Sequence, residues 1–285
     1  MAYKVAYISK NGKFDAASEF ENFASSNGVR FVVEKFDTTA QKAFSAQALT
    51  SFDAVVLSSY LGAGDEFATS IAKSLSLYAK CVFKMQDSSV LTHSNLVIVT
   101  DAHRKSDGGF ATDNEFGRYA HASLRYSELE IERTARTAYE LAEKRSRLLT
   151  LSDAQDGSHV SALWRKITSD INEDYPSVHL EFESTFDTAR KLAENGQTYD
   201  VILTKHSNAD ALSGVADACS PLGEGTSPVA YLGETTVGLY STERALAGSR
   251  LFDALSFAKM LELSFDLPAL SQEWAKQISK LLLQN

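Results

Sequence analysis

The sequence predicts an α/β fold in which a largely parallel central sheet is flanked by helices. Apolar runs of strand length alternate with segments of helical period along most of the chain, which is the pattern of a parallel sheet covered by helices. The chain has 285 residues, of which 44% are hydrophobic and 23% charged. This is enough material for one large or two modest domains, and only four prolines interrupt it.

Eight apolar runs are predicted strands, because each has the length of a strand and a helix is expected between most of them. They are KVAYIS (4–9), VRFVVEKF (29–36), DAVVLSS (53–59), NLVIVTD (95–101), LLTLSD (148–153), VHLEFES (178–184), YDVILT (199–204) and PVAYLG (228–233).

The clearest helix is expected from about Ser127 to Arg147. Its apolar residues recur near helical spacing, and Glu132 stands four residues before Arg136. Further helices are predicted at 160–171, 249–265 and 268–283.

The stretch from residue 102 to 123 follows neither period, is polar and contains glycine. We expect a long loop or a small β-arm, and loops of this length are often functional or contact a partner. The acidic and histidine side chains in and beside it could gather around a cation, although a solvated face is the preferred interpretation. They are Asp101, His103, Asp107 and Asp113.

The net charge of −9 and the pI near 5.2 disfavour nucleic acid and anionic membranes as partners, because these need a basic face. Lys and Arg are scattered along the chain. No stretch approaches the ~20 apolar residues of a membrane span. We expect a soluble protein of the cytoplasm, or of the mitochondrial matrix if a targeting segment has been removed.

Several common site signatures are absent or weak. Cys81 and Cys219 show no metal or redox spacing, which predicts a reducing compartment without disulfides. The glycine-bearing turns 9–13 and 60–66 lack the full spacing of a phosphate loop and are interpreted as ordinary turns between strand and helix. The six histidines have no zinc spacing, so a dedicated zinc site is not expected.

The turn that follows the predicted strand 148–153 lies where open α/β proteins usually place their chemistry. Its side chains include Asp153, Ala154 and Asp156, but no Lys, His, Cys or Arg. The corner therefore offers carboxylates without a base or a nucleophile.

A second corner of this kind opens at TKHSNADALSG (204–214). Asp210 could bind a divalent metal there. Ser207, three residues earlier, also fits a capping box with Asp210, which is the preferred interpretation.

From Asn95 to about Tyr240 the order and wording of the segments resemble the isopropylmalate and isocitrate dehydrogenase family, the metal-dependent β-decarboxylating dehydrogenases. The closer likeness is to the isopropylmalate branch, and the matches cover about half of the chain. The resemblance implies NAD(P) and Mg²⁺ or Mn²⁺ as cofactors and a 2-hydroxy acid as substrate. The matching segments are NLVIVTD, RYSELEIERTARTAYELAEKR, VSALWRKITSDINEDYPSVHLEF, YDVILTKHSNADALSGVADACSPLGEGTSPVAYLGE and VGLY.

At individual positions, the resemblance implies that the catalytic groups are missing. The family's "DKAN" turn corresponds to DAQD (153–156), so the position of the catalytic lysine is Ala154. The tyrosine of "GGIY" is best matched by Phe110, which has no hydroxyl. The positions of the three substrate arginines, which clamp carboxylates in the family, are Ala72, Val82 and Thr100.

The metal and cofactor positions implied by the resemblance are also changed. "GDILSD" corresponds to ADALSG (209–214), which keeps Asp210 and replaces the second aspartate by Gly214. The third aspartate, which the neighbouring subunit gives in the family, falls on Phe186; Asp187 could substitute only if the loop shifted by one residue. The adenine and ribose loop is reduced to 241–250, so we expect no cofactor.

The resemblance further implies two interleaved lobes with a cleft between them. The first, nucleotide-side lobe would comprise residues 1–94 and 238–285, and the second, dimerisation and metal-side lobe residues 95–237. A dimer would form through the second lobe, its helices and the 102–123 arm. Apolar candidates for that interface, which a monomeric core would use as readily, are Ala211, Leu212, Val215, Ala216 and Cys219.

The joint loss of these groups predicts a non-catalytic relative, a pseudoenzyme, because such groups act as a unit in transition-state binding. It would serve as a structural or regulatory subunit, as a homodimer or beside an active paralogue. Ala154 and Phe186 are the two positions donated across the dimer in the family, and both are apolar. The chain is therefore not expected to complete a partner's active site.

Two alternatives stay open. The first is a divergent NAD(P)- and Mg-dependent 3-isopropylmalate or isocitrate dehydrogenase-like oxidoreductase, which requires the acidic side chains to converge. The second is a module that binds a small ligand without turning it over, which requires an open cleft. The residues available for altered chemistry are Asp153, Asp156, Asp187, Asp210 and Lys205 or His206.

Overall fold

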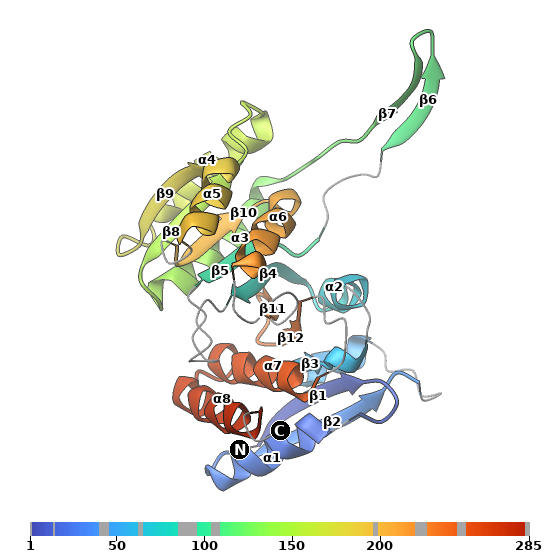
Figure 1. The fold of residues 1–285 in the computed structure, drawn as a ribbon, viewed down its shortest axis with the longest axis vertical. Helices are drawn as coiled ribbons and strands as arrows, with labels where there is room; N and C mark the ends of the chain where they lie inside the picture. The colour runs from blue at the N-terminus through green and yellow to red at the C-terminus, as the bar shows by residue number, and fades with distance from the viewer. Residues whose placement is uncertain are drawn as a thin grey trace.

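The chain forms a ten-stranded sheet with helices packed against it and a separate two-stranded hairpin (Figure 1). The computed structural model describes residues 2–13, 15–39, 46–61, 65–84, 96–103, 109–195, 199–219, 227–243 and 249–282. Within these ranges, the helices are too short or too polar for any of them to cross a membrane.

The strands of the large sheet lie in the order β2-β1-β3-β12-β11-β4-β5-β10-β8-β9. Strand β11 is antiparallel to β12 and β4, and β4 is antiparallel to β5, whereas all other neighbours are parallel. The predicted, largely parallel sheet is therefore confirmed. The strands are β1 (Tyr3–Ser9), β2 (Phe31–Asp37), β3 (Ala54–Leu57), β4 (Leu77–Lys84), β5 (Leu96–Asp101), β8 (Leu148–Asp153), β9 (His179–Ser184), β10 (Val201–Thr204), β11 (Pro228–Gly233) and β12 (Gly238–Thr242).

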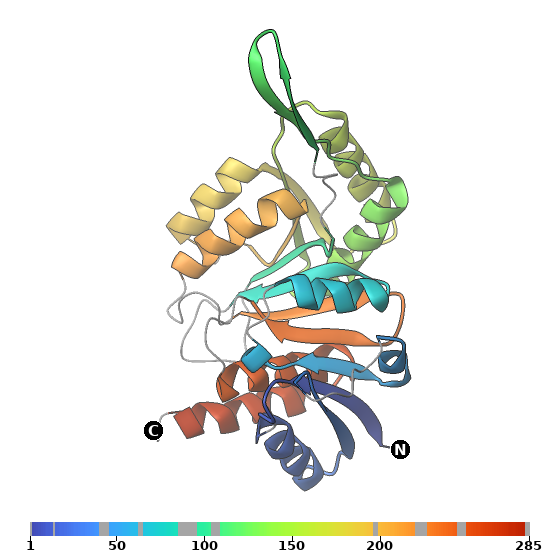
Figure 2. The same ribbon diagram turned by 90° about the vertical axis from the view of Figure 1, so that its right-hand side faces the viewer.

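The helices divide between the two faces of the sheet. Helices α1, α3, α4, α7 and α8 share one apolar cluster with the sheet, while α2 and the α5–α6 pair pack in two further clusters against the other face. In Figure 2 the pairs α3–α4 and α5–α6 flank the upper part of the sheet on opposite sides. The helices are α1 (Asp15–Ser26), α2 (Asp65–Ser74), α3 (Glu128–Glu143), α4 (His159–Asn172), α5 (Thr185–Asn195), α6 (His206–Ala218), α7 (Arg250–Leu263) and α8 (Pro268–Leu282).

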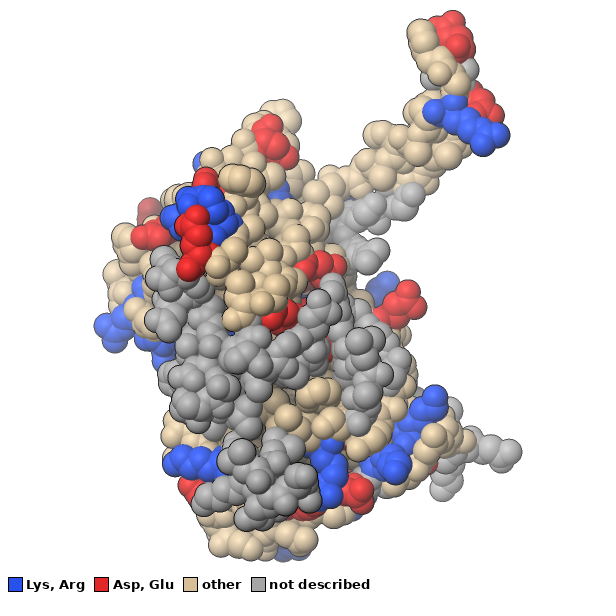
Figure 3. Space-filling model, in the orientation of Figure 1, with Lys and Arg blue, Asp and Glu red and all other residues tan. Residues whose placement is uncertain are grey.

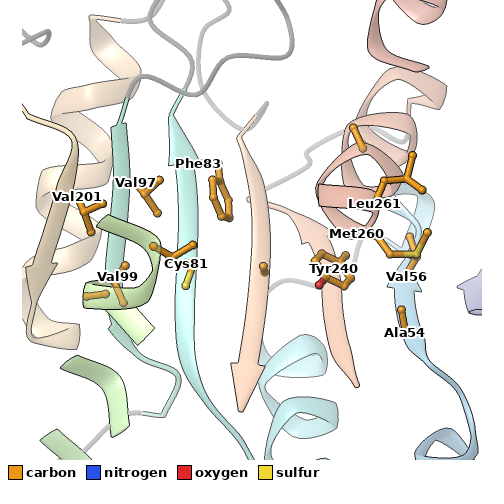
Figure 4. Packing of buried hydrophobic residues seen from close by; sticks show 14 of the residues in the cluster. Ala54, Val56, Cys81, Phe83, Val97, Val99, Val201, Tyr240, Met260 and Leu261 are labelled. Carbon is orange, nitrogen blue, oxygen red and sulfur yellow. The ribbon is translucent and has the colours of Figure 1, made fainter. Parts of the chain in front are cut away.

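Alternation along the strands sends successive side chains into different clusters. Cys81 and Phe83 of β4 point into the cluster shown in Figure 4, whereas Val82 belongs to a cluster on the other face. Full burial of each large apolar side chain contributes about 1.5–3 kcal/mol. Cys81 is buried, Cys219 is exposed, and neither forms a disulfide, as the sequence predicts.

Strands β6 (Phe110–Asn114) and β7 (Gly117–His121) form an antiparallel hairpin that projects far from the body (Figure 1). All five residues of β7 are exposed. The Phe110 ring lies 6.1 Å from that of Tyr119 and 5.5 Å from that of His121, so aromatic rings line one side of the hairpin. The predicted loop or β-arm at 102–123 is thus a β-arm over its described part.

All eight predicted strands are present, with ends within two residues of those expected, and the four predicted helices are α3, α4, α7 and α8. Strands β4 and β12 were not predicted. Strand β4 carries Lys80 and Lys84, which interrupt its apolar run although both are buried.

The division into two lobes remains a prediction. The ten strands form one continuous sheet. Within it, β11 of the predicted second lobe pairs with β12 and β4, which belong to the predicted first lobe.

Candidate functional site

The turn after β8 brings carboxylates to the carboxyl end of the sheet. Strand β8 ends at Asp153, and Ser158 caps the start of α4 by accepting a hydrogen bond from the backbone N–H of Ser161. Between them, Gln155 and Gly157 adopt left-handed backbone angles, with φ of 54° and 72°. The chain therefore reverses tightly beside the end of the neighbouring strand β10.

Lys205, the residue after β10, supplies this corner with the cation that its own turn lacks. Strands β8 and β10 are parallel neighbours, so the residues that follow them lie close together. Lys205 Nζ lies 2.6 Å from Asp153 Oδ1 and 2.9 Å from Ser161 Oγ. The side chains of Lys205 and Asp153 are only 6% and 1% exposed.

Ser161 links the two carboxylates of the corner. Its Oγ lies 2.8 Å from Asp153 Oδ1 and 2.9 Å from Asp156 Oδ1. The backbone N–H of Ala154 donates to Asp153 Oδ1 at 2.8 Å, and Arg165 Nε lies 3.6 Å from Asp153 Oδ2. Two carboxylates thus face two cations within the chain itself.

Both carboxylates are ionised at neutral pH. Burial raises the pKa of Asp153, but hydrogen bonds from Lys205 and Ser161 and the charge of Lys205 outweigh it, so the pKa lies below its ordinary value. The backbone N–H of Ser158, with the Ser158 and Ser161 hydroxyls, lowers the pKa of Asp156 to about 2. The corner is therefore an internal ion cluster, in which the Lys205 ammonium is held by Asp153. Ala154, the position matched to the family lysine, is exposed beside it.

Asp210 lies on the first turn of α6, and the capping box proposed for it is wrong. Helix α6 begins at His206 with Lys205 at its N-cap, and no side chain caps it. Ser207 is already inside the helix and contacts the Asn208 side chain instead. Asp210 is consequently not a cap and is exposed.

A narrow cleft lies between α6 and strands β4 and β5, with Asp210 at its edge. Val82 and Thr100, two positions matched to the family arginines, line it and are buried. The third position, Ala72, is buried in α2 in the same apolar cluster as Val82, but it is not among the residues that line the cleft. The cleft encloses about 10 Å³, the space of about one water molecule. Its other lining residues are Lys80, His206, Ala209, Ser213 and Glu243.

Asp101, at the end of β5, anchors the start of α6. Its Oδ1 accepts hydrogen bonds from the Tyr126 hydroxyl at 3.0 Å and the backbone N–H of His206 at 3.1 Å. Burial, followed by the charge of Asp101, raises the pKa of Tyr126. Asp101 is 3% exposed, so the solvated-face interpretation is wrong for this residue.

The described members of the suggested cation cluster form no group of three ligands that could hold a metal ion. His103 is half-buried, whereas Asp113 is exposed on β6 of the arm. Asp107 lies outside the described residues. The structure thus places Asp113 on the projecting arm, away from Asp101 at the end of β5 (Figure 1).

The position matched to the family's third metal aspartate does not supply a ligand. Phe186 is 77% exposed on the first turn of α5. Ser184 Oγ lies 2.6 Å from Asp187 Oδ2 and accepts a hydrogen bond from the Asp187 backbone N–H at 3.0 Å. The Asp187 carboxylate is therefore engaged at the start of α5.

The residues present do not fit a metal ion of the family's kind. Of the three matched metal positions, only Asp210 carries a carboxylate, since the others are Gly214 and Phe186. Mg²⁺ prefers an octahedral set of oxygen ligands. No group of three His, Cys, Asp or Glu in the described part of the chain is arranged to hold a metal ion. Among the carboxylates considered for altered chemistry, only Asp153 and Asp156 share a hydrogen-bond partner.

The glycine turn after β1 is filled by a carboxylate of the chain. The backbone N–H groups of Asn11 and Gly12 donate to Asp37 at 3.2 and 2.8 Å. This agrees with an ordinary turn at 9–13. Residues 62–64 of the second glycine turn, and 244–248 of the segment matched to the cofactor loop, lie outside the described residues.

Basic and acidic residues are interspersed on the face of the molecule shown in Figure 3. On the face shown in Figure 3, Lys and Arg lie apart from one another, and several stand next to Asp or Glu. The exposed pairs Lys166–Asp170 and Arg190–Glu194 are examples. This distribution agrees with the scatter of Lys and Arg in the sequence.

Sequence reasoning missed the buried cations of this region. Lys205 was named only as an alternative, and Lys84, which pairs with Asp217 and Glu243, was not named. A lysine at the end of an apolar strand or directly after it is the signal that could have found them. Burial of an unpaired charge is costly, so such a lysine indicates a buried acidic partner.

Comparison with known proteins identifies related sequences. A family model described as isocitrate/isopropylmalate dehydrogenase matches residues 73–250. The 3-isopropylmalate dehydrogenase of Methylococcus capsulatus is 32% identical over 180 residues, which cover 60% of this chain and 50% of that protein. The corresponding enzyme of Synechococcus sp. (strain JA-2-3B'a(2-13)) is 33% identical over 184 residues, covering 62% and 49%. The chain thus spans about half the length of these curated relatives.

A solved structure supports the same fold. The β-decarboxylating dehydrogenase of Thermococcus kodakarensis, in its apo form, superposes with a TM-score of 0.71. The match covers 95% of this chain and 88% of that chain at 17% sequence identity. The superposition supports the fold, and the family match over residues 73–250 shows that the chain belongs to the isocitrate/isopropylmalate dehydrogenase family.

Proposed function

We propose that this chain is a non-catalytic relative of the isopropylmalate and isocitrate dehydrogenases that acts as a structural or regulatory subunit through the family's dimer interface. The observation that carries the proposal is the internal pairing of Asp153 with Lys205 beside Ala154. The corner that would hold the catalytic lysine has its charges satisfied within the chain. It therefore has no free basic group to offer a substrate.

The cleft supports the same function. Substrate carboxylates need bidentate cationic partners, but Val82 and Thr100 are uncharged and buried. The space enclosed between α6 and the sheet is about 10 Å³, far below the 300–1,000 Å³ that is typical of ligand sites. The described part of this cleft offers no room for a 2-hydroxy acid.

The arm supports assembly with a second subunit. An isolated two-stranded hairpin is marginally stable in water, so an exposed one is expected to gain from a partner. Phe110 and Tyr119 lie on one side of the arm and are 56% and 44% exposed. We expect this aromatic side to face another chain.

Helix α6 contributes less to such an interface than the sequence allows. Leu212 and Ala216 are buried in the chain's own core against β5 and β10. Ala211 and Cys219 are exposed and Val215 is half-buried, so these three remain available to a partner.

Two measurements on the purified protein test the proposal. With NAD⁺ or NADP⁺, Mg²⁺ or Mn²⁺, and isopropylmalate or isocitrate, we expect no formation of reduced nucleotide, whereas a family member measured in parallel is active. Sedimentation equilibrium is expected to give the mass of a dimer. Turnover above the no-enzyme rate would refute the non-catalytic part, and a monomer at high concentration would refute assembly as a homodimer.

Calorimetric titration tests the two alternative functions. The divergent-enzyme alternative requires the acidic side chains to converge, and Asp210 is the one matched metal position that keeps a carboxylate. Binding of NAD(P), or of a Mg²⁺ complex of isopropylmalate or isocitrate, would support that alternative or a ligand-binding module. We expect no heat from any of them.

A further inference from the structure

Three charged side chains from distant parts of the chain meet at the C-terminal end of α6. Lys84 Nζ lies 2.6 Å from Asp217 Oδ1 and 2.5 Å from Glu243 Oε2. Their side chains are 1%, 5% and 4% exposed. Lys84 ends β4, Asp217 lies in the last turn of α6, and Glu243 follows β12. The cluster therefore ties α6 to two strands of the sheet.

Hydroxyl groups complete the cluster. Ser213, one turn before Asp217 on α6, donates to Glu243, with its Oγ 2.7 Å from Oε1 and 2.9 Å from Oε2. Ser227 Oγ donates to Asp217 Oδ1 at 3.4 Å, and the backbone N–H of Glu243 donates to the Ser227 carbonyl at 2.8 Å. We call these five residues, Lys84, Ser213, Asp217, Ser227 and Glu243, the α6 cluster.

The α6 cluster closes one side of the narrow cleft. Ser213 and Glu243 belong both to the cluster and to the lining of the cleft. At the other end of α6, the backbone N–H of His206 is held by Asp101. Helix α6 is thus fastened to the sheet by polar contacts at both ends, with the cleft between them.

The polar attachment of α6 to the sheet at this end depends on all three charged residues of the cluster. One ammonium group stands between two carboxylates, and Asp217 meets the negative end of the helix dipole. If Lys84 were neutral, two carboxylates would lie buried and close together, which strongly disfavours the packed state. Neutralising all three side chains together removes the repulsion between the two carboxylates and also removes their attraction to Lys84.

We infer that the α6 cluster is an internal latch that holds α6 down on β4 and keeps the cleft beneath it closed. This goes beyond the proposed function, because it concerns the opening of α6 whether or not the chain is catalytic. The latch closes one side of the cleft. Its ion pairs keep α6 in place and so prevent ligands from entering. Opening of α6 should therefore expose Val82 without unfolding the rest of the sheet.

Neighbouring residues on β4 provide a test of local opening. Val82 lines the cleft, whereas Cys81 points to the opposite face and is fully buried in the main core. In a Val82→Cys/Cys219→Ser protein, labelling of residue 82 by N-ethylmaleimide reports opening of the cleft. Labelling of Cys81 in the same molecules reports opening of the main core.

We compare this protein with one that also carries Lys84→Met, Asp217→Asn and Glu243→Gln, which removes the three charges while nearly keeping their volumes. We expect residue 82 to react at least about tenfold faster in the neutralised protein, with the labelling rate of Cys81 unchanged. Ser213→Ala, which removes one hydroxyl and no charge, should give a smaller increase at residue 82. Lys166→Met, which breaks an exposed pair of 2.5 Å with Asp170, is the control and should change neither rate.

Two outcomes would overturn the latch. An unchanged rate at residue 82 in the neutralised protein would show that packing alone closes the cleft. Equal acceleration at residues 81 and 82 would show general loss of stability. If the neutralised protein did not fold, the same comparison with Ser213→Ala would decide between local and general opening.

Discussion

Lys205 Nζ and Asp153 Oδ1 lie 2.6 Å apart at the ends of two parallel strands, and both side chains are buried. The pair fixes β8, β10 and the starts of α4 and α6 relative to one another. At a corner where open α/β proteins usually bind their ligands, this chain has a buried ion pair.

Removing one member of the pair should destabilise the protein strongly. We expect Lys205→Met to lower the free energy of unfolding by about 3–5 kcal/mol, because it leaves the Asp153 carboxylate buried without its closest cation. Urea unfolding followed by tryptophan fluorescence measures this. Lys205→Met with Asp153→Asn should recover part of the loss, and Lys166→Met, at an exposed pair, should cost no more than about 1 kcal/mol. Equal effects at the buried and exposed pairs would contradict the prediction.

Asp156 should make stability depend on acid pH. Its pKa falls from an ordinary 3.8 to about 2 in the folded chain, so its contribution is present above pH 4 and is lost as the pH falls towards 2. In Asp156→Asn this contribution is absent at every pH. Urea unfolding between pH 6 and pH 2.5 should therefore show a stability difference between the two proteins that shrinks on acidification. A difference that stayed constant with pH would argue against ionisation as its cause.

We expect the Phe20 side chain to contribute strongly to the stability of the first half of the sheet. Its ring stacks on Phe257 at 4.4 Å and lies 5.1 Å from Phe31 and 5.6 Å from Trp274. We expect Phe20→Ala to lower the free energy of unfolding by about 3–5 kcal/mol, because it opens a cavity in a fully buried cluster. Phe116, in the turn of the arm, is 89% exposed, so Phe116→Ala should change the free energy of unfolding by less than about 0.5 kcal/mol. Urea unfolding of both variants checks the contrast.

The arm should matter for association and not for the stability of one chain. If its aromatic side contacts a partner, Phe110→Ser with Tyr119→Ser should raise the dimer dissociation constant at least about tenfold. Ala111→Ser with Ala120→Ser, on the other side of the same hairpin, is the matched control. Sedimentation velocity over a range of concentrations measures the constants. An unchanged constant in the aromatic double variant would show that the arm is not part of the interface.

The hydrophobic pattern of the sequence is sufficient to determine the class of fold. Runs such as LLTLSD and YDVILT predict parallel strands because a strand buried on both faces must be apolar throughout. The pattern fails at β4, where LYAKCVFK places Lys80 and Lys84 inside a buried strand. The apolar neighbours of these lysines signal burial, but nothing local identifies the acidic partners of Lys84, since Asp217 and Glu243 lie elsewhere in the chain.

In the candidate site, too, the sequence determines some features and the tertiary structure determines others. The sequence by itself determined which residue types stand at the matched positions, and therefore that Ala154 carries no amine and Gly214 no carboxylate. Only the tertiary structure decided that Lys205 pairs with Asp153 and that Lys84 joins Asp217 to Glu243. Local periodicity records the environment of each residue, whereas the choice of an ionic partner depends on which strand ends the sheet brings together. That choice is made by strand order and burial, which no short stretch of sequence contains.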